Sequence, residues 1–555
     1  MSSPALPFGG PFSPGREEPH DSPAISSTRA TAPPGSTPAS TNAPDFWSPS
    51  AVWTLDDFVL DPGYLPFQEE LRSLIFKIAA TAAPTREATP DDRPSVGEAE
   101  HVHTVLLSEE TGSPAASTRE ASPARFLLFQ EPNIPNDVAD LQAQTSAILS
   151  RGRHVEYMAN YVSEIAPWLD MFDSERAFGI QVPVLARSSP ALLYSVLALS
   201  ARHMERKAAR ARRARDATGS RSSATAGHSF DSLELYQEAI RLVGPLLEAR
   251  DPAVIPVCTV LCVTEMMSAS APDWRRHLEG CAALFEAFGV HGFTGGLPQA
   301  VFWCYARMDL CGALISDGLE DTLVPIHRWL PPGAELQGAG DIFRSLGSPD
   351  MCANYSVFLC SKACGLIAAR TRYVELGDTN GCTDQVYRAR WLSLWLELQA
   401  WLDQRPLEMC PIQTIETSPF PRILFVHWAA ISSNQLYHTA CILLLGLLPR
   451  FNDPGERPTG LAGSAIYHAK RVCGISQTNL HQGCLNNAIQ PLWIAGRLLS
   501  HPTEHSVIVK LLRNIEATTG WGTCWRIPDL EAAWGYQAGR SQKFNRQGKV
   551  PTDAG

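Results

Sequence analysis

Residues 190–207 read PALLYSVLALSARHMERK, and this stretch indicates the fold class of the chain. Its strongly apolar residues recur at intervals of three and four, as one face of an α-helix requires, and they are Leu193, Val196, Leu197 and Met204. Pro190 follows Ser189, and proline is accepted in a first helical turn because the N–H that it lacks would have no partner there. We therefore predict a helix that begins at Pro190 and buries this apolar stripe.

The same helical pattern extends from about residue 125 to residue 536. Further helix starts and left-handed helix ends are marked by Pro252, Pro298 and Pro502, and by Gly289 and Gly520. Alternating strand patterns are scarce, and the spacing between the predicted helices is too irregular for a repeat protein. The sequence therefore predicts an all-α fold: a large multi-helix domain over 125–536, with residues 190–207 and 488–519 in its core.

The segments that flank this domain have a different composition. Residues 1–45 and the linker 84–124 are dominated by small and polar residues, whose apolar surface is too small to offset the entropy of ordering them. We predict that the first is disordered and the second largely so. Between them, residues 46–83 form an acidic-aromatic segment followed by an amphipathic helix at 68–80. Residues 537–555 are a polar tail.

Charge and hydropathy limit the classes of function. The formal net charge of −11 argues against a general nucleic-acid coat protein, because non-specific affinity comes from Lys and Arg on phosphates. Any contact with nucleic acid must then come from a local basic patch or from a partner. The N-terminus lacks the pattern of a secretory signal, and the longest apolar runs, 191–201 and 440–448, fall short of the ~20 residues of a membrane span. We expect an intracellular protein with no membrane partner.

The 14 cysteines all lie at or beyond Cys258 and are scattered through apolar segments. Cys258 and Cys262 are four residues apart, as are Cys360 and Cys364. Two thiolates alone do not make a tetrahedral zinc site, and no histidine flanks these pairs at the required spacing. We interpret the cysteines as small residues of the core.

Residues 157–207, YMANYVSEIAPWLDMFDSERAFGIQVPVLARSSPALLYSVLALSARHMERK, resemble the fungal-specific transcription factor domain. The resemblance continues through blocks such as LELYQEAIRLVGPLLEARDPAVIPVCTVLCVTEMMS and covers most of 125–536. It implies an α-helical regulatory domain, a nuclear location and a role in controlling transcription. The partners that it implies are the transcription machinery and a related regulator, in a homodimer or a heterodimer.

The chain departs from this family at one point. Members usually begin with six cysteines that bind two zinc ions and set a helix in the DNA major groove, whereas no cysteine precedes Cys258. We therefore expect no zinc cofactor in this chain, and direct DNA binding only if a reader is present elsewhere. Either the reader was lost, or the gene start is misassigned. The leading hypothesis is a fungal-type transcriptional regulator, and the alternative is a non-DNA-binding protein that modulates a zinc-cluster factor.

A basic cluster follows the apolar part of the helix that begins at Pro190. Its members are Arg202, Arg206, Lys207, Arg210, Arg212, Arg213 and Arg215. We expect Arg202, Arg206, Arg210 and Arg213 to lie on the face opposite the apolar stripe. Beyond Met204, we expect packing not to need Lys207, Arg210, Arg212, Arg213 and Arg215. One interpretation is a solvated helix face. The other is a nuclear-import or phosphate-contacting patch, because clustered Lys and Arg are what import receptors and nucleic-acid backbones recognise.

A second candidate lies in the stretch AVWTLDDFVLDPGY, residues 51–64. Its acidic residues alternate with bulky apolar ones, and the residues of interest are Trp53, Leu55, Asp56, Asp57, Phe58 and Leu60. Such segments fold onto coactivator grooves. The alternative is an N-terminal arm that docks its apolar residues onto the helical domain.

Signatures of enzymes are scarce. The sequence has no phosphate-binding glycine loop, dinucleotide turn or nucleophile elbow. His501, Glu504 and His505 match one metalloprotease pattern, but Pro502 makes His501 a helix-entry residue, so we interpret this stretch as a helix start. We do not expect an enzyme.

Overall fold

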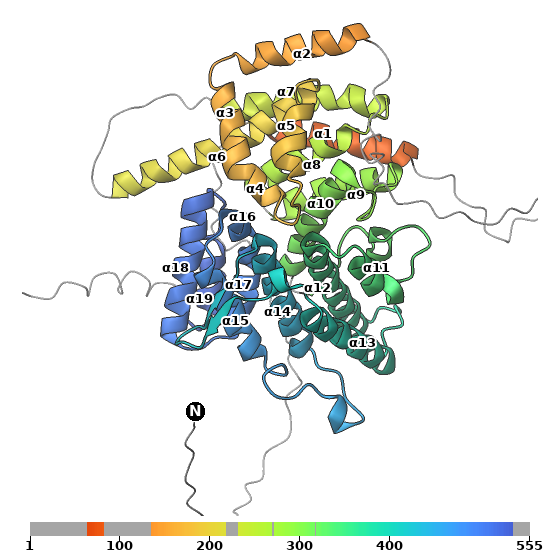
Figure 1. The fold of residues 1–555 in the computed structure, drawn as a ribbon, viewed down its shortest axis with the longest axis vertical. Coiled ribbons are helices and arrows are strands. Elements are labelled where there is room, and N and C mark those ends of the chain that lie inside the picture. The colour runs from red at the N-terminus through yellow and green to blue at the C-terminus, as the bar shows by residue number, and fades with distance from the viewer. Residues whose placement is uncertain (1–63, 83–134, 218–230, 269–270, 317, 537–555) are drawn as a thin grey trace, which may run out of the picture. The chain divides into compact units, whose positions relative to one another are not determined.

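Helices dominate the computed structural model, which describes residues 64–82, 135–217, 231–268, 271–316 and 318–536 (Figure 1). The helices up to residue 315 are α1 (Tyr64–Ala82), α2 (Pro135–Leu149), α3 (His154–Asn160), α4 (Ala166–Leu169), α5 (Val182–Leu185), α6 (Pro190–Ala217), α7 (Asp231–Glu248), α8 (Val254–Ser268), α9 (Ala271–Ala287) and α10 (Gly296–Ile315). Those that follow are α11 (Ala339–Ser345), α12 (Pro349–Thr371), α13 (Asp384–Asp403), α14 (Trp428–Gly446), α15 (Ala465–Thr478), α16 (Gln482–Leu485), α17 (Ile489–Gly496), α18 (Pro502–Thr519) and α19 (Arg526–Ala533). The predicted all-α fold is confirmed.

Short irregular helices and one hairpin complete the described elements. The π-helical turns are η2 (Tyr161–Ile165), η3 (Ala177–Gln181) and η6 (Arg372–Leu376). The 3-10 turns are η4 (Ile326–Trp329), η5 (Leu336–Gly338), η7 (Leu407–Met409), η8 (Pro454–Glu456) and η9 (Asn486–Ala488). The strands β1 (Gln413–Ile415) and β2 (Arg422–Leu424) pair in antiparallel register, with Thr414 opposite Ile423.

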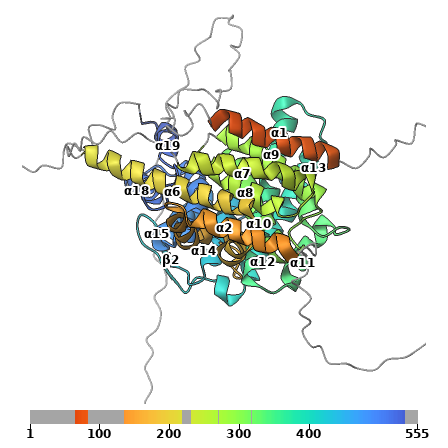
Figure 2. The ribbon, with the colours of Figure 1, turned by 90° about the horizontal axis from the view of Figure 1, so that it is seen from above.

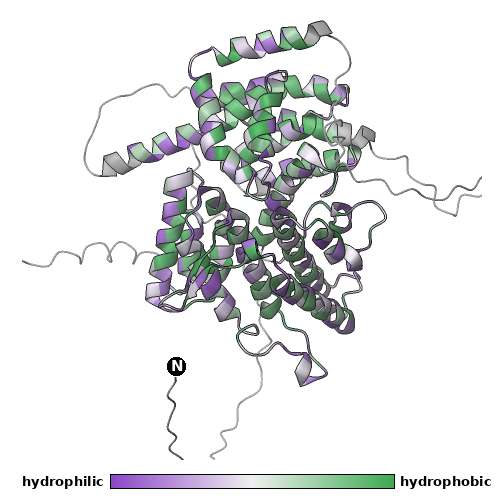
Figure 3. Cartoon of the chain, viewed as in Figure 1, coloured by the Kyte–Doolittle hydropathy of each residue, from purple (hydrophilic) through white to green (hydrophobic). Residues whose placement is uncertain are grey.

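Composition decides which helices lie in the interior. α8 reads VIPVCTVLCVTEMMS and α14 reads WAAISSNQLYHTACILLLG, and both are buried on nearly every side. A helix that is apolar all round has no face to offer to water, so it must be surrounded by other helices. Figure 3 shows the contrast with the outer part of α6, where hydrophilic residues gather.

Residues 190–207, the stretch that indicated the fold class, form a helix with a buried apolar stripe, as the sequence predicts. α6 begins at Pro190 and packs along α7 and α8. Leu193, Val196 and Leu197 of its apolar stripe are fully buried, and Met204 packs against the core at its edge. The second predicted core block contains α17, in which every residue is buried, and the inner face of α18.

The amphipathic helix predicted at 68–80 is longer than expected, because α1 begins at Tyr64. It contacts α7 and α9 and runs beside them in Figure 2. Although residues 83–134 separate α1 from α2 in the sequence, α1 belongs to the same compact unit as the helices from α2 to α19.

Most predicted helix boundaries are found within a turn of their signals. α18 begins at Pro502, and Gly520 ends it in the left-handed conformation with φ of 69°. Gly289 has φ of 63° and closes the turn after α9. Pro252 lies in a turn that precedes α8 instead of inside its first turn, because α8 begins at Val254.

The hairpin has one edge covered by side chains from the end of α15. The backbone N–H of Phe425 donates to Asn479 Oδ1 at 3.0 Å, and Asn479 Nδ2 donates to the carbonyl of Ile423 at 2.7 Å. Thr478 Oγ1 accepts the N–H of Ile423 at 3.2 Å. Two side chains thus occupy the positions that a third strand would fill.

Among the described residues, one helical stretch, Pro349–Leu376, is long and apolar enough to cross a membrane by length and composition. Of its most apolar window, 83% is buried against other parts of the chain. That burial is typical of the central helix of a folded domain.

Candidate functional site

The first residue of the basic cluster of α6 is Arg202, and it does not lie where the sequence predicts. Arg202 is 1% exposed, and its Nε donates to Ser268 Oγ of α8 at 2.9 Å. Its Nη1 lies 3.8 Å from Glu205 Oε2, and the same carboxylate accepts the N–H and hydroxyl of Ser232 at the start of α7. The expectation that Arg202 faces solvent is wrong. A helical wheel shows which side of α6 is apolar, but it cannot show that α7 and α8 also cover the polar side.

The next residues of the cluster fasten α6 to the end of α18. Arg206 Nε donates to the carbonyl of Gly520 at 2.8 Å. Arg210 Nη1 lies 2.6 Å from Glu516 Oε1, and its Nη2 donates to the carbonyl of Arg513 at 3.3 Å. We call these contacts the α6–α18 joint; in Figure 1 the outer part of α6 crosses the upper end of α18. The expectation that packing does not need Arg210 is therefore wrong.

The carboxylate at the centre of the α6–α18 joint is charged at neutral pH. Burial alone would raise the pKa of the Glu516 carboxyl. Hydrogen bonds from Cys524 and from the N–H of Thr523, together with the Arg210 guanidinium, outweigh burial and hold this pKa below its ordinary value. The folded state therefore binds fewer protons here than the unfolded chain, so this contribution to stability is lost as the pH falls through the ordinary range of a carboxyl.

Lys207 connects α6 to a third element. Its Nζ lies 3.5 Å from Glu164 Oε2 of η2, and Gln482 Nε2 of α16 donates to the same oxygen at 2.5 Å. The Lys207 side chain is 38% exposed and the Glu164 side chain is 33% exposed. Solvent therefore limits the stabilisation that this ion pair provides. Arg212 is exposed, and the side chains of Arg213 and Arg215 lie outside the described residues. The exposed Arg513 of α18 extends the basic surface, and sequence patterns did not signal it, because it lies some 300 residues further along the chain.

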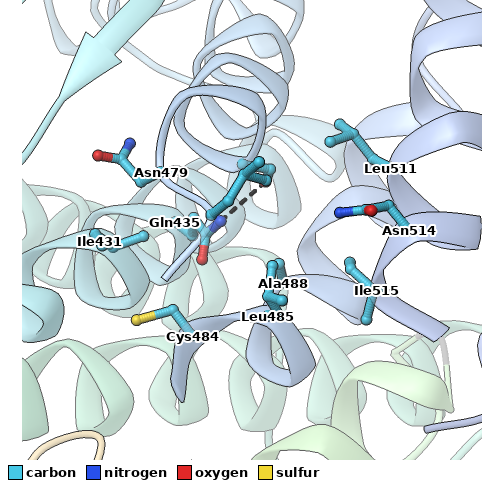
Figure 4. A pocket seen from close by; sticks show the side chains of 11 residues that line it. Ile431, Gln435, Asn479, Cys484, Leu485, Ala488, Leu511, Asn514 and Ile515 are labelled. Atoms are coloured by element: carbon cyan, nitrogen blue, oxygen red, sulfur yellow. Dashed lines mark hydrogen bonds between the residues drawn. The ribbon is translucent and has the colours of Figure 1, made fainter. Parts of the chain in front are cut away.

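A pocket lies on the opposite side of α18, among α14, α15, α16 and η9 (Figure 4). It is small, with a cavity volume of about 10 Å³, which is room for about one water molecule. It is lined by Ile431, Gln435, Ser476, Asn479, Leu480, Cys484, Leu485, Ala488, Leu511, Asn514 and Ile515. Apolar side chains and neutral amides make up most of this lining.

The chemistry of the pocket is that of a neutral site. Gln435 Nε2 donates to Ser476 Oγ at 2.9 Å, and Gln435 Oε1 has no partner among the described residues. Burial raises the pKa of the Cys484 thiol to about 12, so the thiol stays protonated. At neutral pH the lining therefore presents amides, a hydroxyl and a protonated thiol, and none of its residues is charged.

The cysteines of the described segments are spread over many helices and are not grouped as metal ligands. All 14 lie in described segments as free thiols, most of them buried, and Cys262 Sγ lies 3.3 Å from Cys281 Sγ across α8 and α9. Burial raises the pKa of the Cys258 thiol well above its ordinary range, which disfavours the thiolate that a metal needs. Within the described residues, no three His, Cys, Asp or Glu side chains are grouped as metal ligands. The cysteines of this chain do not fit the six-cysteine zinc cluster of the family that the sequence resembles.

The stretch that begins at His501 is a helix start, as the sequence predicts. His501 caps α18, and its backbone N–H donates to Glu504 Oε2 at 3.3 Å. His505 stacks on Trp534 with ring centroids 3.8 Å apart, and its Nε2 bonds the carbonyl of Leu499. The acidic-aromatic candidate, Trp53 to Leu60, lies outside the described residues.

Comparison with known proteins finds one family model that matches part of the helical domain. Residues 156–368, from α3 to α12, match the fungal specific transcription factor domain. The resemblance predicted from the sequence is confirmed over this stretch. The match takes in the buried helices α6, α8 and α10 and the basic end of α6.

One curated relative is the transcription activator AMTR1 of Alternaria alternata. It is 23% identical to this chain in an alignment of 342 positions, and the match covers 51% of this chain and 44% of the relative. The chain thus spans less than half of the length of that protein. No solved structure gives a significant match.

Proposed function

We propose that this protein is a fungal-type transcriptional regulator that acts through its helical domain. The observation that carries the proposal is the match of residues 156–368 to the fungal specific transcription factor domain. The relative named as a transcription activator supports the same class.

The proposal includes a nuclear location and partners in the transcription machinery. The exposed part of the α6 end, with Arg212 and the neighbouring Arg513, supplies a basic surface for an import receptor or for nucleic-acid phosphates. No three His, Cys, Asp or Glu side chains are grouped as metal ligands among the described residues, so we assign sequence-selective contact with DNA to a reader outside them or to a partner, in a homodimer or a heterodimer with a related regulator.

The test is chromatin immunoprecipitation of the tagged full-length chain, combined with transcript profiling after its rapid depletion. We expect the chain at a defined set of promoters, and we expect transcripts from those promoters to change first. A chain that is absent from chromatin, with no early change in transcripts, would contradict the proposal. The alternative, a protein that modulates a cluster-bearing factor without a reader of its own, predicts occupancy that disappears when that factor is removed.

A further inference from the structure

Helix α1 is held in the helical domain by a polar contact at the floor of a groove. The groove is formed by α7, α8 and α9, and the carboxylate of Glu265 from α8 lies at its base with 1% exposure. Tyr64 donates its hydroxyl to Glu265 Oε2, and Gln68 Nε2 donates to the same oxygen at 2.8 Å. Tyr236 of α7 donates its hydroxyl to the other oxygen, Oε1. His277 Nε2 of α9 lies 3.9 Å from Oε2.

The rest of the inner face of α1 is apolar and follows helical spacing. Leu71 and Ile75 are each 1% exposed, and with Tyr64 and Gln68 they form one stripe at positions i, i+4, i+7 and i+11. The outer face carries Leu65 and the Glu69 side chain, both mostly exposed. This pattern of anchors is that of an amphipathic helix laid into a groove.

A glycine on α9 makes room for α1. A Cβ at Gly280 would stand 2.5 Å from Ile75 Cγ2 and 3.2 Å from Ile75 Cβ, closer than real side chains approach. Glycine inside a helix costs about 0.5–1 kcal/mol relative to alanine, so its presence in the middle of α9 requires a compensating contact. The close approach of Ile75 supplies that contact.

We propose that α1 is a helical strap that closes a helix-binding groove on this domain, with the Glu265 carboxylate as the group that recognises it. The occupant is the α1 of the same chain, which is joined to α2 through residues 83–134. The groove selects a helix that presents a hydroxyl and an amide N–H to the carboxylate and two aliphatic residues to the α9 side. Release of α1 uncovers both the apolar groove and the Glu265 carboxylate. Because exposing both is unfavourable, α1 leaves the groove only in exchange for another helix of this kind. The inference does not rest on the proposed function.

The test uses the full chain and hydrogen exchange measured by mass spectrometry. Gly280→Ala should speed exchange of the α1 amides at least ten-fold while the amides of α12 keep their rates. Gly446→Ala is the matched control, because a Cβ there meets nothing within 4 Å. The two changes are chemically identical, and alanine favours both helices. Unchanged α1 exchange in Gly280→Ala would overturn the proposal, and so would equal acceleration in α1 and α12, since α1 would then not come away as a unit.

Glu265→Gln tests the recognition group separately. The amide keeps one acceptor oxygen, so it loses either the α1 donors, Tyr64 and Gln68, or Tyr236. We expect faster α1 exchange again, whereas Glu70→Gln on the exposed face of α1 should leave the exchange unchanged. A result in which both glutamate variants behave alike would contradict recognition by Glu265.

A cleavage experiment establishes which chain supplies α1. A site for a specific protease is inserted after residue 100 in the full chain, and the cut protein is passed through a gel-filtration column. The α1 fragment should co-elute with the remainder at monomer size, and Gly280→Ala should release it. A fragment that leaves the wild-type protein on cutting would overturn the strap. Dimers of the uncut chain that exchange α1 between copies would overturn the assignment to the same chain.

Discussion

Asn479 offers the sharpest test of how the hairpin is attached to the helical domain. Its side chain accepts from the N–H of Phe425 and donates to the carbonyl of Ile423, and all three residues are less than 10% exposed. In Asn479→Ala the carbonyl of Ile423 in β2 and the N–H of Phe425 just after β2 both lose this partner. A buried polar group without a partner costs about 1–3 kcal/mol, so we expect the free energy of unfolding to fall by roughly 2–6 kcal/mol.

The measurement is chemical denaturation of the purified chain, with exchange of the Phe425 amide as the local readout. Asn514→Ala is the control, because Asn514 lines the same pocket but its side chain is exposed, and substitutions of that kind stay within about ±0.5 kcal/mol. Asn479→Asp keeps the acceptor and loses the donor, so it should fall between the wild type and Asn479→Ala. If Asn479→Ala were as stable as the Asn514→Ala control, the assignment of Asn479 as a substitute strand would be refuted.

Three further predictions concern other parts of the molecule. Changing Arg212, Arg213 and Arg215 together to Gln spares the α6–α18 joint, so the melting temperature should not change; a fluorescent fusion should lose its nuclear signal, and retention of that signal removes the import role. Burial lowers the pKa of His203 to about 4 from an ordinary 6.5, so the folded state binds fewer protons here than the unfolded chain. The contribution of His203 to stability is therefore present above pH 6.5 and is lost as the pH falls towards 4. Between pH 7.5 and 5 the melting temperature should fall less in His203→Gln than in the wild type. The purified chain should hold no stoichiometric zinc by elemental analysis and should bind duplex DNA weakly, with a steep dependence on salt, and tight, sequence-selective binding by the chain alone would contradict this.

The local features of the fold were readable from the sequence. Period, proline and glycine are local signals, and they placed the start of α6 at Pro190, the start of α18 at Pro502 and the end of α18 at Gly520. The two strands were not predicted, because three residues are too few to show an alternating pattern. Their position depends on Asn479, which follows β2 by more than 50 residues.

Long-range contacts between polar groups were not readable. Arg202 has the sequence environment of an exposed helix residue, and its burial depends on α7 and α8 closing over it. Arg210 reads as part of a solvated cluster, and its partner Glu516 is about 300 residues away. The role of Glu265 is equally hidden, because a single acidic residue in an apolar helix gives no indication of which hydroxyl and amide donors will meet it.

The most direct test of the central claim is a tethering assay. The full chain is fused to a heterologous DNA-binding domain and brought to a reporter promoter in a fungal host. The account predicts that the fusion changes reporter transcription several-fold relative to the DNA-binding domain alone. It also predicts that Trp303→Ala weakens the change, because Trp303 is 2% exposed and truncating a buried Trp destabilises the helical domain by about 3–5 kcal/mol. A fusion that is expressed, nuclear and folded but leaves the reporter unchanged would contradict the claim that this domain regulates transcription.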